Sequence, residues 1–126
     1  IMDGCGPDRF CPDQPATRAE IARILIRALY GENFSVPPSP LFADVSISHP
    51  DYRYIQKLKE AGITGGCSAT AFCPDARTNR GEMAVLLTRA RLRTSAGQSI
   101  PHLAIPYFED VPITHPFFPF IQKVRE

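Results

Sequence analysis

Residues 10–22 read FCPDQPATRAEIA, and residues 72–84 repeat that pattern as FCPDARTNRGEMA. A second pattern, FADVSISHPDYRYIQK at residues 42–57, returns as FEDVPITHPFFPFIQK at residues 108–123. The copies lie about 62 to 66 residues apart. This spacing indicates one supersecondary unit copied in tandem, each copy burying its apolar face against its neighbours. A module repeated in this way is more often a binding or structural element than an enzyme.

The repeats divide the chain into five segments. We predict the C-terminal half of a first repeat at residues 1–34, a Pro-rich linker at 35–41, a complete repeat at 42–93, a second linker at 94–106, and the N-terminal half of a third repeat at 107–126. Because the first and last residues match interior positions of the complete repeat, we expect the chain to be part of a longer protein.

The composition restricts the function classes. Of the 126 residues, 44% are hydrophobic, which is enough for a packed core. The net charge of +1 argues against nucleic-acid binding, because such proteins gather basic side chains on one face. No apolar run approaches the roughly 18 residues of a membrane span.

One kind of helix is predicted from apolar spacing and capping signals. Apolar residues recur every three or four positions after Thr17, and Thr17 with Glu20 forms a capping box. Gly31 is a stop signal for this helix. Asn79 and Glu82 repeat the capping box one copy later.

A second kind of helix follows each His-Pro pair. Pro50 and Pro116 fit first-turn positions, where the missing amide hydrogen costs nothing. Gly62 ends the first of these helices, and His49 and His115 are expected to be turn or cap residues. Since no sustained alternation of apolar and polar residues is present, we predict an all-α fold of tandem helix–loop–helix repeats with long ordered loops.

The four cysteines form two pairs, Cys5 with Cys11 and Cys67 with Cys73, each with five residues between its members. Disulfides within the pairs would close short loops, a gain of roughly 2 kcal/mol each, and would place the protein outside the reducing cytosol. Two alternatives remain open. The thiols are either reduced and buried, or they share one zinc site, although five intervening residues exceed the usual spacing.

These features together resemble S-layer homology repeats. The family pattern is a Phe-x-Asp-Val start, a histidine-containing helix ending in Gly-Ile, a Gly-rich loop, a Phe-x-Pro turn, and a Thr-Arg-Ala-Glu motif opening a second helix. The chain matches it, in order, with Phe42-Ala43-Asp44-Val45, His49, Gly62-Ile63, Gly66, Phe72-Cys73-Pro74, Arg80 and Glu82. Thr17-Arg18-Ala19-Glu20 matches the last motif letter for letter, and the resemblance covers nearly the whole chain.

The resemblance implies an extracellular module that holds exported proteins on the cell envelope by binding cell-wall polysaccharide. In that family, anionic sugars bind in grooves lined by the Arg and Glu of the last motif and by the preceding loop. Carried over, the candidate glycan-binding residues are Arg18, Glu20, Arg80, Glu82, Asp44 and Tyr52. A guanidinium offers a planar fork for a sugar carboxylate, and a helix N-terminus adds amide donors.

Two departures from the family pattern bear on sugar binding. The family often has Trp after the first-helix histidine, whereas this chain has proline there and no Trp at all. Tyr52 and Phe118, two residues after the prolines, are then the aromatic rings available for stacking. The second copy of the last motif reads Asn79-Arg80-Gly81-Glu82, with glycine in place of alanine.

The candidates also have structural interpretations. Capping alone explains Glu20 and Glu82, whereas a first-turn arginine is mildly unfavourable and therefore favours a ligand role for Arg18 and Arg80. Asp44 is expected to bond local amides at the turn before its helix, as is its copy at position 110. The four repeated phenylalanines are expected to fill the core; they are Phe10, Phe42, Phe72 and Phe108.

No catalytic arrangement and no haem-attachment motif is present. We therefore predict a non-catalytic, extracellular cell-envelope module without a cofactor, whose partner is an anionic cell-surface polysaccharide. One alternative is a self-assembling structural subunit of a surface layer or extracellular filament, whose half-repeats are completed head to tail by neighbouring copies. Another surface protein is a further candidate partner. A weaker alternative is an intracellular interaction module that binds zinc.

Overall fold

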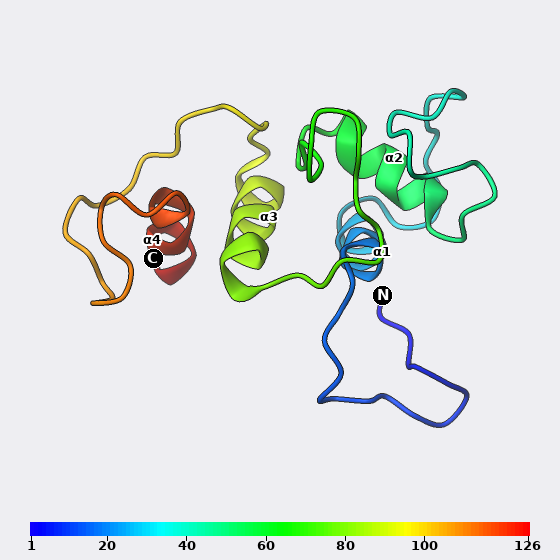
Figure 1. Ribbon diagram of the computed structural model, residues 1–126, viewed down its shortest axis with the longest axis horizontal. Helices are drawn as coiled ribbons and strands as arrows, with labels where there is room; N and C mark the ends of the chain where they lie inside the picture. Colours follow the sequence, from blue (N-terminus) through cyan, green and yellow to red (C-terminus); the bar gives the residue numbers. More distant parts are fainter. The chain divides into compact units, whose positions relative to one another are not determined.

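A computed structural model describes all 126 residues and contains four α-helices and no β-sheet. In chain order they are α1 (Arg18–Tyr30), α2 (Tyr52–Glu60), α3 (Arg80–Leu92) and α4 (Phe118–Arg125), joined by long loops (Figure 1). The predicted all-α fold class is confirmed. None of the helices combines the length and the apolar character needed to cross a membrane.

The chain forms two compact units, each built around one pair of helices. The first unit comprises Ile1–Ala61 and Gly65–Thr78, and within it α1 packs against α2. The second unit comprises Gly62–Thr64 and Asn79–Glu126, and within it α3 packs against α4. The loop of the predicted complete repeat therefore folds with the two helices that precede it.

The capping boxes predicted for α1 and α3 are present. Thr17 Oγ1 accepts a hydrogen bond from the Glu20 amide at 3.2 Å, and the Glu20 carboxylate accepts one from the Thr17 amide at 3.0 Å. Asn79 and Glu82 make the same two bonds at 2.8 and 2.9 Å. α1 stops at Gly31, whose φ of 70° is a conformation that glycine adopts without strain.

Both shorter helices begin two residues after their prolines. The predicted first-turn positions of Pro50 and Pro116 were therefore wrong, because both prolines lie in the preceding turns. The two histidines explain why each helix begins after its proline. Nδ1 of His49 and of His115 each accepts a hydrogen bond, at 3.0 Å, from the amide two residues further on. This side-chain turn keeps the backbone out of the helical bonding pattern until the helix begins.

A buried glutamine in each shorter helix holds the segment that leads into it. Gln56 is 1% exposed, and its side chain accepts from the Leu41 amide at 2.8 Å while donating to the carbonyls of Pro37 and Ser39. Gln122 repeats this arrangement with the linker of the second unit, again through one accepted and two donated bonds. The Pro-rich linker is thus tied to the core.

The core of the first unit is formed by aliphatic side chains of α1 and α2 and by two phenylalanines from the loops. Ile26, Phe42, Ile55, Leu58 and Phe72 are each at most 2% exposed. This burial confirms the core prediction for two of the four repeated phenylalanines.

The other two phenylalanines were predicted wrongly. Phe10 is 59% exposed and Phe108 is 41% exposed. Their copies, Phe72 and Phe42, are buried because the two rings pack against each other with centroids 5.4 Å apart. Neither Phe10 nor Phe108 packs on another aromatic ring, so each remains at the surface.

Both predicted disulfides are present. Cys5 pairs with Cys11 and Cys67 with Cys73, with Cα atoms 6.1 and 6.0 Å apart, and no cysteine is free. The two loops also share one backbone conformation. Cys11 and Cys73 both have a φ of 57°, and the amides of Cys5 and Cys67 bond the carbonyl four residues on at 2.9 and 2.8 Å. The duplication in sequence is therefore a duplication in structure.

Candidate functional site

A carboxylate joins two segments of the first unit that are distant in sequence. Asp44 accepts hydrogen bonds from the amides of Phe72 at 2.8 Å and Cys73 at 2.7 Å, and the Ala43 amide donates to Thr70 O at 2.8 Å. We call this arrangement, residues 42–44 held against residues 70–73, the Asp44 joint. The expectation that Asp44 bonds local amides was wrong, because its partners lie 28 and 29 residues away.

Two aromatic rings fill the joint. Phe42 and Phe72 pack with their ring planes at 41° to each other and are almost fully buried. Gly66 leaves the space for this packing, since a Cβ there would lie 2.4 Å from Ala71 O and 2.7 Å from a carbon of the Phe42 ring. Its φ of 89° also disfavours any other residue.

The environment of Asp44 keeps the carboxylate ionised at neutral pH. Burial raises the pKa of Asp44, but the hydrogen bonds from the Phe72 and Cys73 amides, assisted by the charge of Arg18, outweigh burial and hold the pKa below its ordinary value. Both carboxylate oxygens are used inside the chain. The role of Asp44 is therefore structural, because its carboxylate holds the loop that contains Phe72 and Cys73.

Arg18 fastens α1 to the same loop. Its Nε donates to Phe72 O at 2.8 Å, and its guanidinium carbon lies 4.9 Å from the centroid of the Phe72 ring. The Arg18 amide donates to Ala76 O at 2.8 Å, and the Ala19 amide donates to Pro74 O at 3.0 Å. The expectation that free amides at this helix N-terminus bind a sugar was therefore wrong, because the loop already occupies them.

Lys59 adds a second cation to the joint. Its Nζ lies 5.3 Å from the centroid of the Phe42 ring, so Arg18 and Lys59 cover one ring each of the aromatic pair. The sequence gives no signal for Lys59, because a lysine near the end of an amphipathic helix is ordinary. Only the folded arrangement brings Lys59 to the aromatic pair that Arg18 also contacts.

The remaining predicted residues do not join this cluster. Glu20 and Glu82 are engaged in the capping boxes. Tyr52 is 5% exposed, so its ring offers no stacking surface for a sugar. Arg80 is exposed on α3 in the second unit and makes no ion pair or hydrogen bond through its side chain. The structure thus brings together Arg18 and Asp44.

The glycine of the altered motif has a packing reason. A Cβ on Gly81 would lie 2.7 Å from Cδ2 of Phe117, a ring carbon in the turn before α4. The second unit therefore needs glycine where the family motif has alanine. This departure concerns helix packing and says nothing against a role for the neighbouring Arg80.

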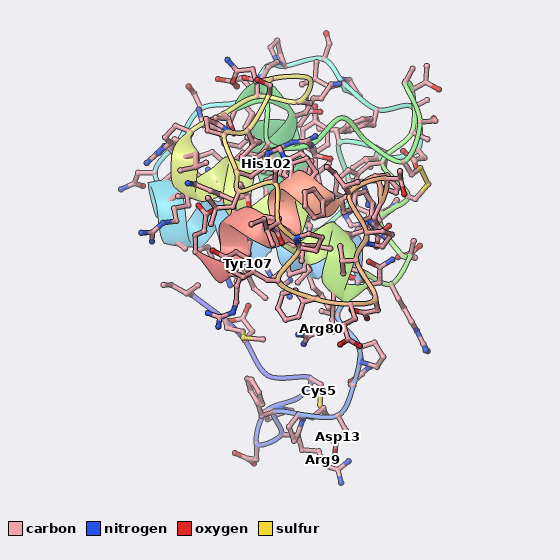
Figure 2. All side chains as sticks on the ribbon, turned by 90° about the vertical axis from the view of Figure 1, so that its left-hand side faces the viewer. Cys5, Arg9, Asp13, Arg80, His102 and Tyr107 are labelled. Carbon is pink, nitrogen blue, oxygen red and sulfur yellow. A yellow bond between two sulfur atoms is a disulfide. The ribbon has the colours of Figure 1, made fainter.

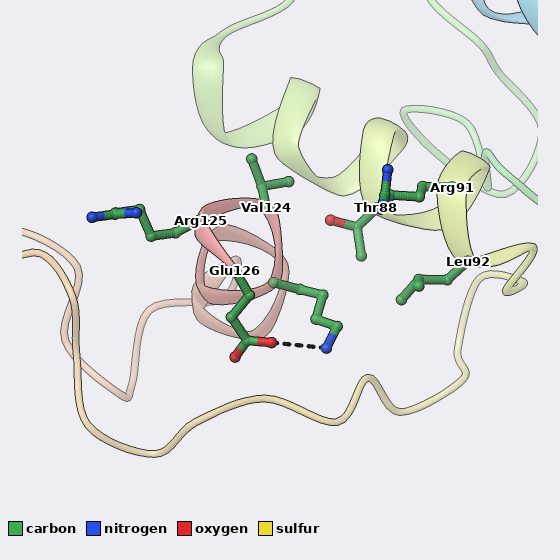
Figure 3. Close-up of a pocket in the computed structure, with 7 residues that line it drawn as sticks. Thr88, Arg91, Leu92, Val124, Arg125 and Glu126 are labelled. Atoms are coloured by element: carbon green, nitrogen blue, oxygen red, sulfur yellow. Dashed lines mark hydrogen bonds and ion pairs between the residues drawn. The ribbon is translucent and has the colours of Figure 1, made fainter.

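The second unit has a shallow hollow near the ends of α3 and α4 (Figure 3). The hollow is lined by Thr88, Arg91, Leu92, Lys123, Val124, Arg125 and Glu126. Lys123 is paired with Glu126 at 2.8 Å. Basic side chains are favourable at helix C-termini, where the partial charge of the helix is negative, so helix termination accounts for this cluster.

Comparison with known families identifies the segment that contains the joint. Residues 41–84 match the family model of the S-layer homology domain. The matched segment includes Asp44 and the Cys67–Cys73 loop, and no curated protein shows significant similarity to the chain. Residues 41–84 of this chain are therefore an S-layer homology domain, the kind of non-catalytic module that generally anchors proteins to cell-wall polymers of the envelope.

Proposed function

We propose that this chain anchors an exported protein to the cell envelope by binding an anionic cell-wall polysaccharide through the first unit, without catalysing a reaction. The family match supports envelope association and the anchoring role. The two disulfides favour an oxidising location outside the cytosol. The anionic nature of the polymer and the residues that bind it are our inference from the joint.

The observation that carries the proposal is the state of the Arg18 side chain. Only Nε is used, by Phe72 O, and the two terminal nitrogens make no hydrogen bond within the chain. The Nε hydrogen bond and the cation–π contact with the Phe72 ring together hold the guanidinium in position. A fixed guanidinium with unused terminal donors suits one carboxylate or another planar anion.

Lys59 supplies the second positive group. It lies over the other ring of the same aromatic pair, and we assign it as a second cationic contact for an acidic polymer held by Arg18. Tyr52 and Phe118, the aromatic residues that follow the position of the absent Trp, are buried and offer no stacking surface. Recognition therefore depends on charge and weakens as ionic strength rises.

The proposal is tested by co-sedimentation of residues 1–126 with purified cell walls that carry their polysaccharide, and with the same walls after its removal. We expect binding to the first preparation alone, and a loss of about tenfold or more in Arg18→Gln, since a hydrogen bond to a charged group is worth about 1.5–3 kcal/mol. Arg9→Gln is the matched control, because Arg9 lies at the end of the N-terminal loop (Figure 2) and forms no ion pair.

Thermal unfolding of each variant separates lost binding from lost folding, because Arg18 also holds the loop. Arg18→Lys keeps the charge without the fork, and we expect intermediate binding. Equal binding to both wall preparations, or unchanged binding by a folded Arg18→Gln variant, would overturn the proposal.

A further inference from the structure

An arginine near the end of the longer helix has the same setting in both units. Arg27 of α1 and Arg89 of α3 occupy equivalent positions of the repeat. Nη1 of Arg27 donates a hydrogen bond to the Ile1 carbonyl at 3.4 Å, and Nη1 of Arg89 donates one to the Ile63 carbonyl at 3.1 Å. Ile1 and Ile63 are themselves copies of one another. The surroundings of the two guanidinium groups can therefore be compared group by group.

In the first unit, two carboxylates neutralise this arginine. Asp3 binds Nη1 of Arg27 at 2.6 Å, and Glu32 binds Nε. The Tyr54 hydroxyl donates to the other oxygen of Glu32 at 2.7 Å, and the centroid of the Tyr54 ring lies 5.3 Å from the guanidinium carbon of Arg27. The hydrogen bond with Asp3 raises the pKa of Arg27. The charge of Arg27 is therefore balanced within the chain.

In the second unit, the equivalent positions carry no carboxylate and no phenol. The replacements are Gly65 for Asp3, Thr94 for Glu32 and Phe120 for Tyr54. The aromatic contact is kept, because the centroid of the Phe120 ring lies 5.2 Å from the guanidinium carbon of Arg89. The second unit therefore keeps the arginine and its ring but has lost both counter-ions.

Two buried polar atoms are left without partners by these replacements. Nε of Arg89 and Oγ1 of Thr94 are both buried and make no hydrogen bond. Burial lowers the pKa of Arg89, and no acidic group offsets this effect. Buried charges are normally paired, because removing an ion from water is costly. The isolated charge of Arg89 therefore requires an explanation.

The difference between the units lies within the chain. Arg27 is bound by groups at residues 1, 3, 32 and 54, and none of them follows α2. The equivalent positions of the second unit are residues 63, 65, 94 and 120, and the structure describes all four. The missing counter-ions are therefore a difference in sequence between two complete surroundings.

We infer that Arg89 binds a carboxylate from outside the chain, in the position that the Asp3 carboxylate has on Nη1 of Arg27. The Asp3 side chain is 57% exposed, so a carboxylate in this position lies on the solvent side of the guanidinium. A charge-assisted hydrogen bond from the guanidinium compensates the charge that Arg89 otherwise carries alone. The ligand is therefore an organic acid or an acidic sugar.

The acidic-sugar form of the inference rests on the proposed function, because an acidic wall polymer carries the carboxylates that Arg89 would bind. It then gives the second unit a polymer contact of its own, separate from Arg18. The carboxylate chemistry at Arg89 does not depend on the polymer. Free organic acids supply the same group, and the experiment distinguishes the two sources.

Nuclear magnetic resonance of the arginine Nε–H groups tests the site, with sodium acetate as the probe and sodium chloride at equal ionic strength as the control. We expect a saturable shift of the Arg89 signal with acetate alone. The Arg27 signal should stay in place, because Asp3 and Glu32 already bind its guanidinium. An unmoved Arg89 signal, equal shifts of Arg27 and Arg89, or the same shift with chloride would overturn the inference.

The same measurement with purified wall polysaccharide identifies the source of the carboxylate. A polymer ligand should move the Arg89 signal at a lower carboxylate concentration than acetate does, whereas equal concentrations would overturn the acidic-sugar form. The Arg18 signal reports on the proposed function and the Arg89 signal on this inference. Failure of one is therefore distinguishable from failure of the other.

A variant that restores the internal counter-ion gives a second test. Arg89→Gln also loses the bond to Ile63 O, so a variant that keeps Arg89 is more informative. Thr94→Glu supplies the carboxylate that the first unit has at this position, and Thr94→Gln is the matched uncharged control. We expect acetate binding to weaken about tenfold or more in Thr94→Glu alone, with thermal unfolding at a higher temperature than in Thr94→Gln. Equal acetate affinity in the two folded variants would contradict the site.

Discussion

The Asp44 carboxylate and the Phe72 amide, 28 residues apart in sequence, are joined by a hydrogen bond of 2.8 Å. This bond brings the disulfide loop of the S-layer homology domain onto the turn that precedes α2. The loop in turn holds Arg18 on the Phe72 ring. Arg18, the candidate binding residue, is therefore positioned by the hydrogen bond that holds the loop to Asp44.

Asp44→Ala should destabilise the first unit by about 2 kcal/mol or more, because two amides lose a charged acceptor. Urea unfolding followed by circular dichroism measures the change. Asp75→Ala is the control, as Asp75 is exposed and forms no ion pair. Equal midpoints for the two variants would show that the joint contributes nothing to stability.

Acid should weaken the joint. The folded pKa of Asp44 lies below the unfolded value of about 3.9, so its stabilisation is complete above that value and is lost as the pH falls through the folded pKa. The pKa of Asp3 is also lowered, by its hydrogen bond with Arg27, and adds a loss of the same sign. Stability measured from pH 6 to pH 2 should therefore fall less steeply in Asp44→Asn than in the wild type. Parallel curves would exclude Asp44 as a contributor.

The two disulfides should differ in their effect on stability. The Cys67–Cys73 loop packs in the joint, so replacing both cysteines by serine should cost roughly 2 kcal/mol. The Cys5–Cys11 loop has an exposed Phe10, and the same double replacement there should change the unfolding midpoint much less. Calorimetry of the two variants makes the comparison, and a reversed order would contradict this account of the joint.

Gln56→Leu should release the Pro-rich linker. Leucine cannot replace the bonds to the Leu41 amide and to the carbonyls of Pro37 and Ser39, and the buried groups left unpaired cost about 1–3 kcal/mol. Limited proteolysis should then cut residues 35–41 faster than in the wild type. Gln98→Leu, an exposed position, is the control. An unchanged cutting rate would mean that Gln56 does not hold the linker.

Gly81→Ala restores the family motif but should lower stability. Alanine is the better helix former by about 1 kcal/mol, yet its Cβ would lie 2.7 Å from the Phe117 ring. In the background of Phe117→Ala the same change should become neutral or favourable. A double-mutant cycle from chemical unfolding measures this coupling, and additive effects would rule out the contact.

The sequence predicts most of the local structure, because helix caps and disulfide spacing are encoded within a few residues. Thr17 and Asn79 start their helices as expected. Contacts between residues distant in the chain were not predicted from the sequence. Nothing near Asp44 indicates that it binds the loop beginning at Cys67, and the repeat pattern alone did not reveal that Phe10 and Phe108 lack the partners their copies have.

The candidate site was predicted in part. Arg18 was found through the family motif, since a first-turn arginine is not needed for capping. Tyr52 was chosen for its distance from the histidine, but its apolar ring turns into the core. Lys59 gives no signal in sequence, because only the packing of Phe42 on Phe72 brings it to the aromatic pair that Arg18 also contacts.

The most direct test of polysaccharide binding by the first unit is nuclear magnetic resonance of the arginine Nε–H groups while purified cell-wall polysaccharide is added. Our account predicts that the Arg18 signal shifts in a saturable way that high salt reverses, whereas the Arg9 signal stays in place. A polysaccharide that binds at saturation without moving the Arg18 signal would contradict the account.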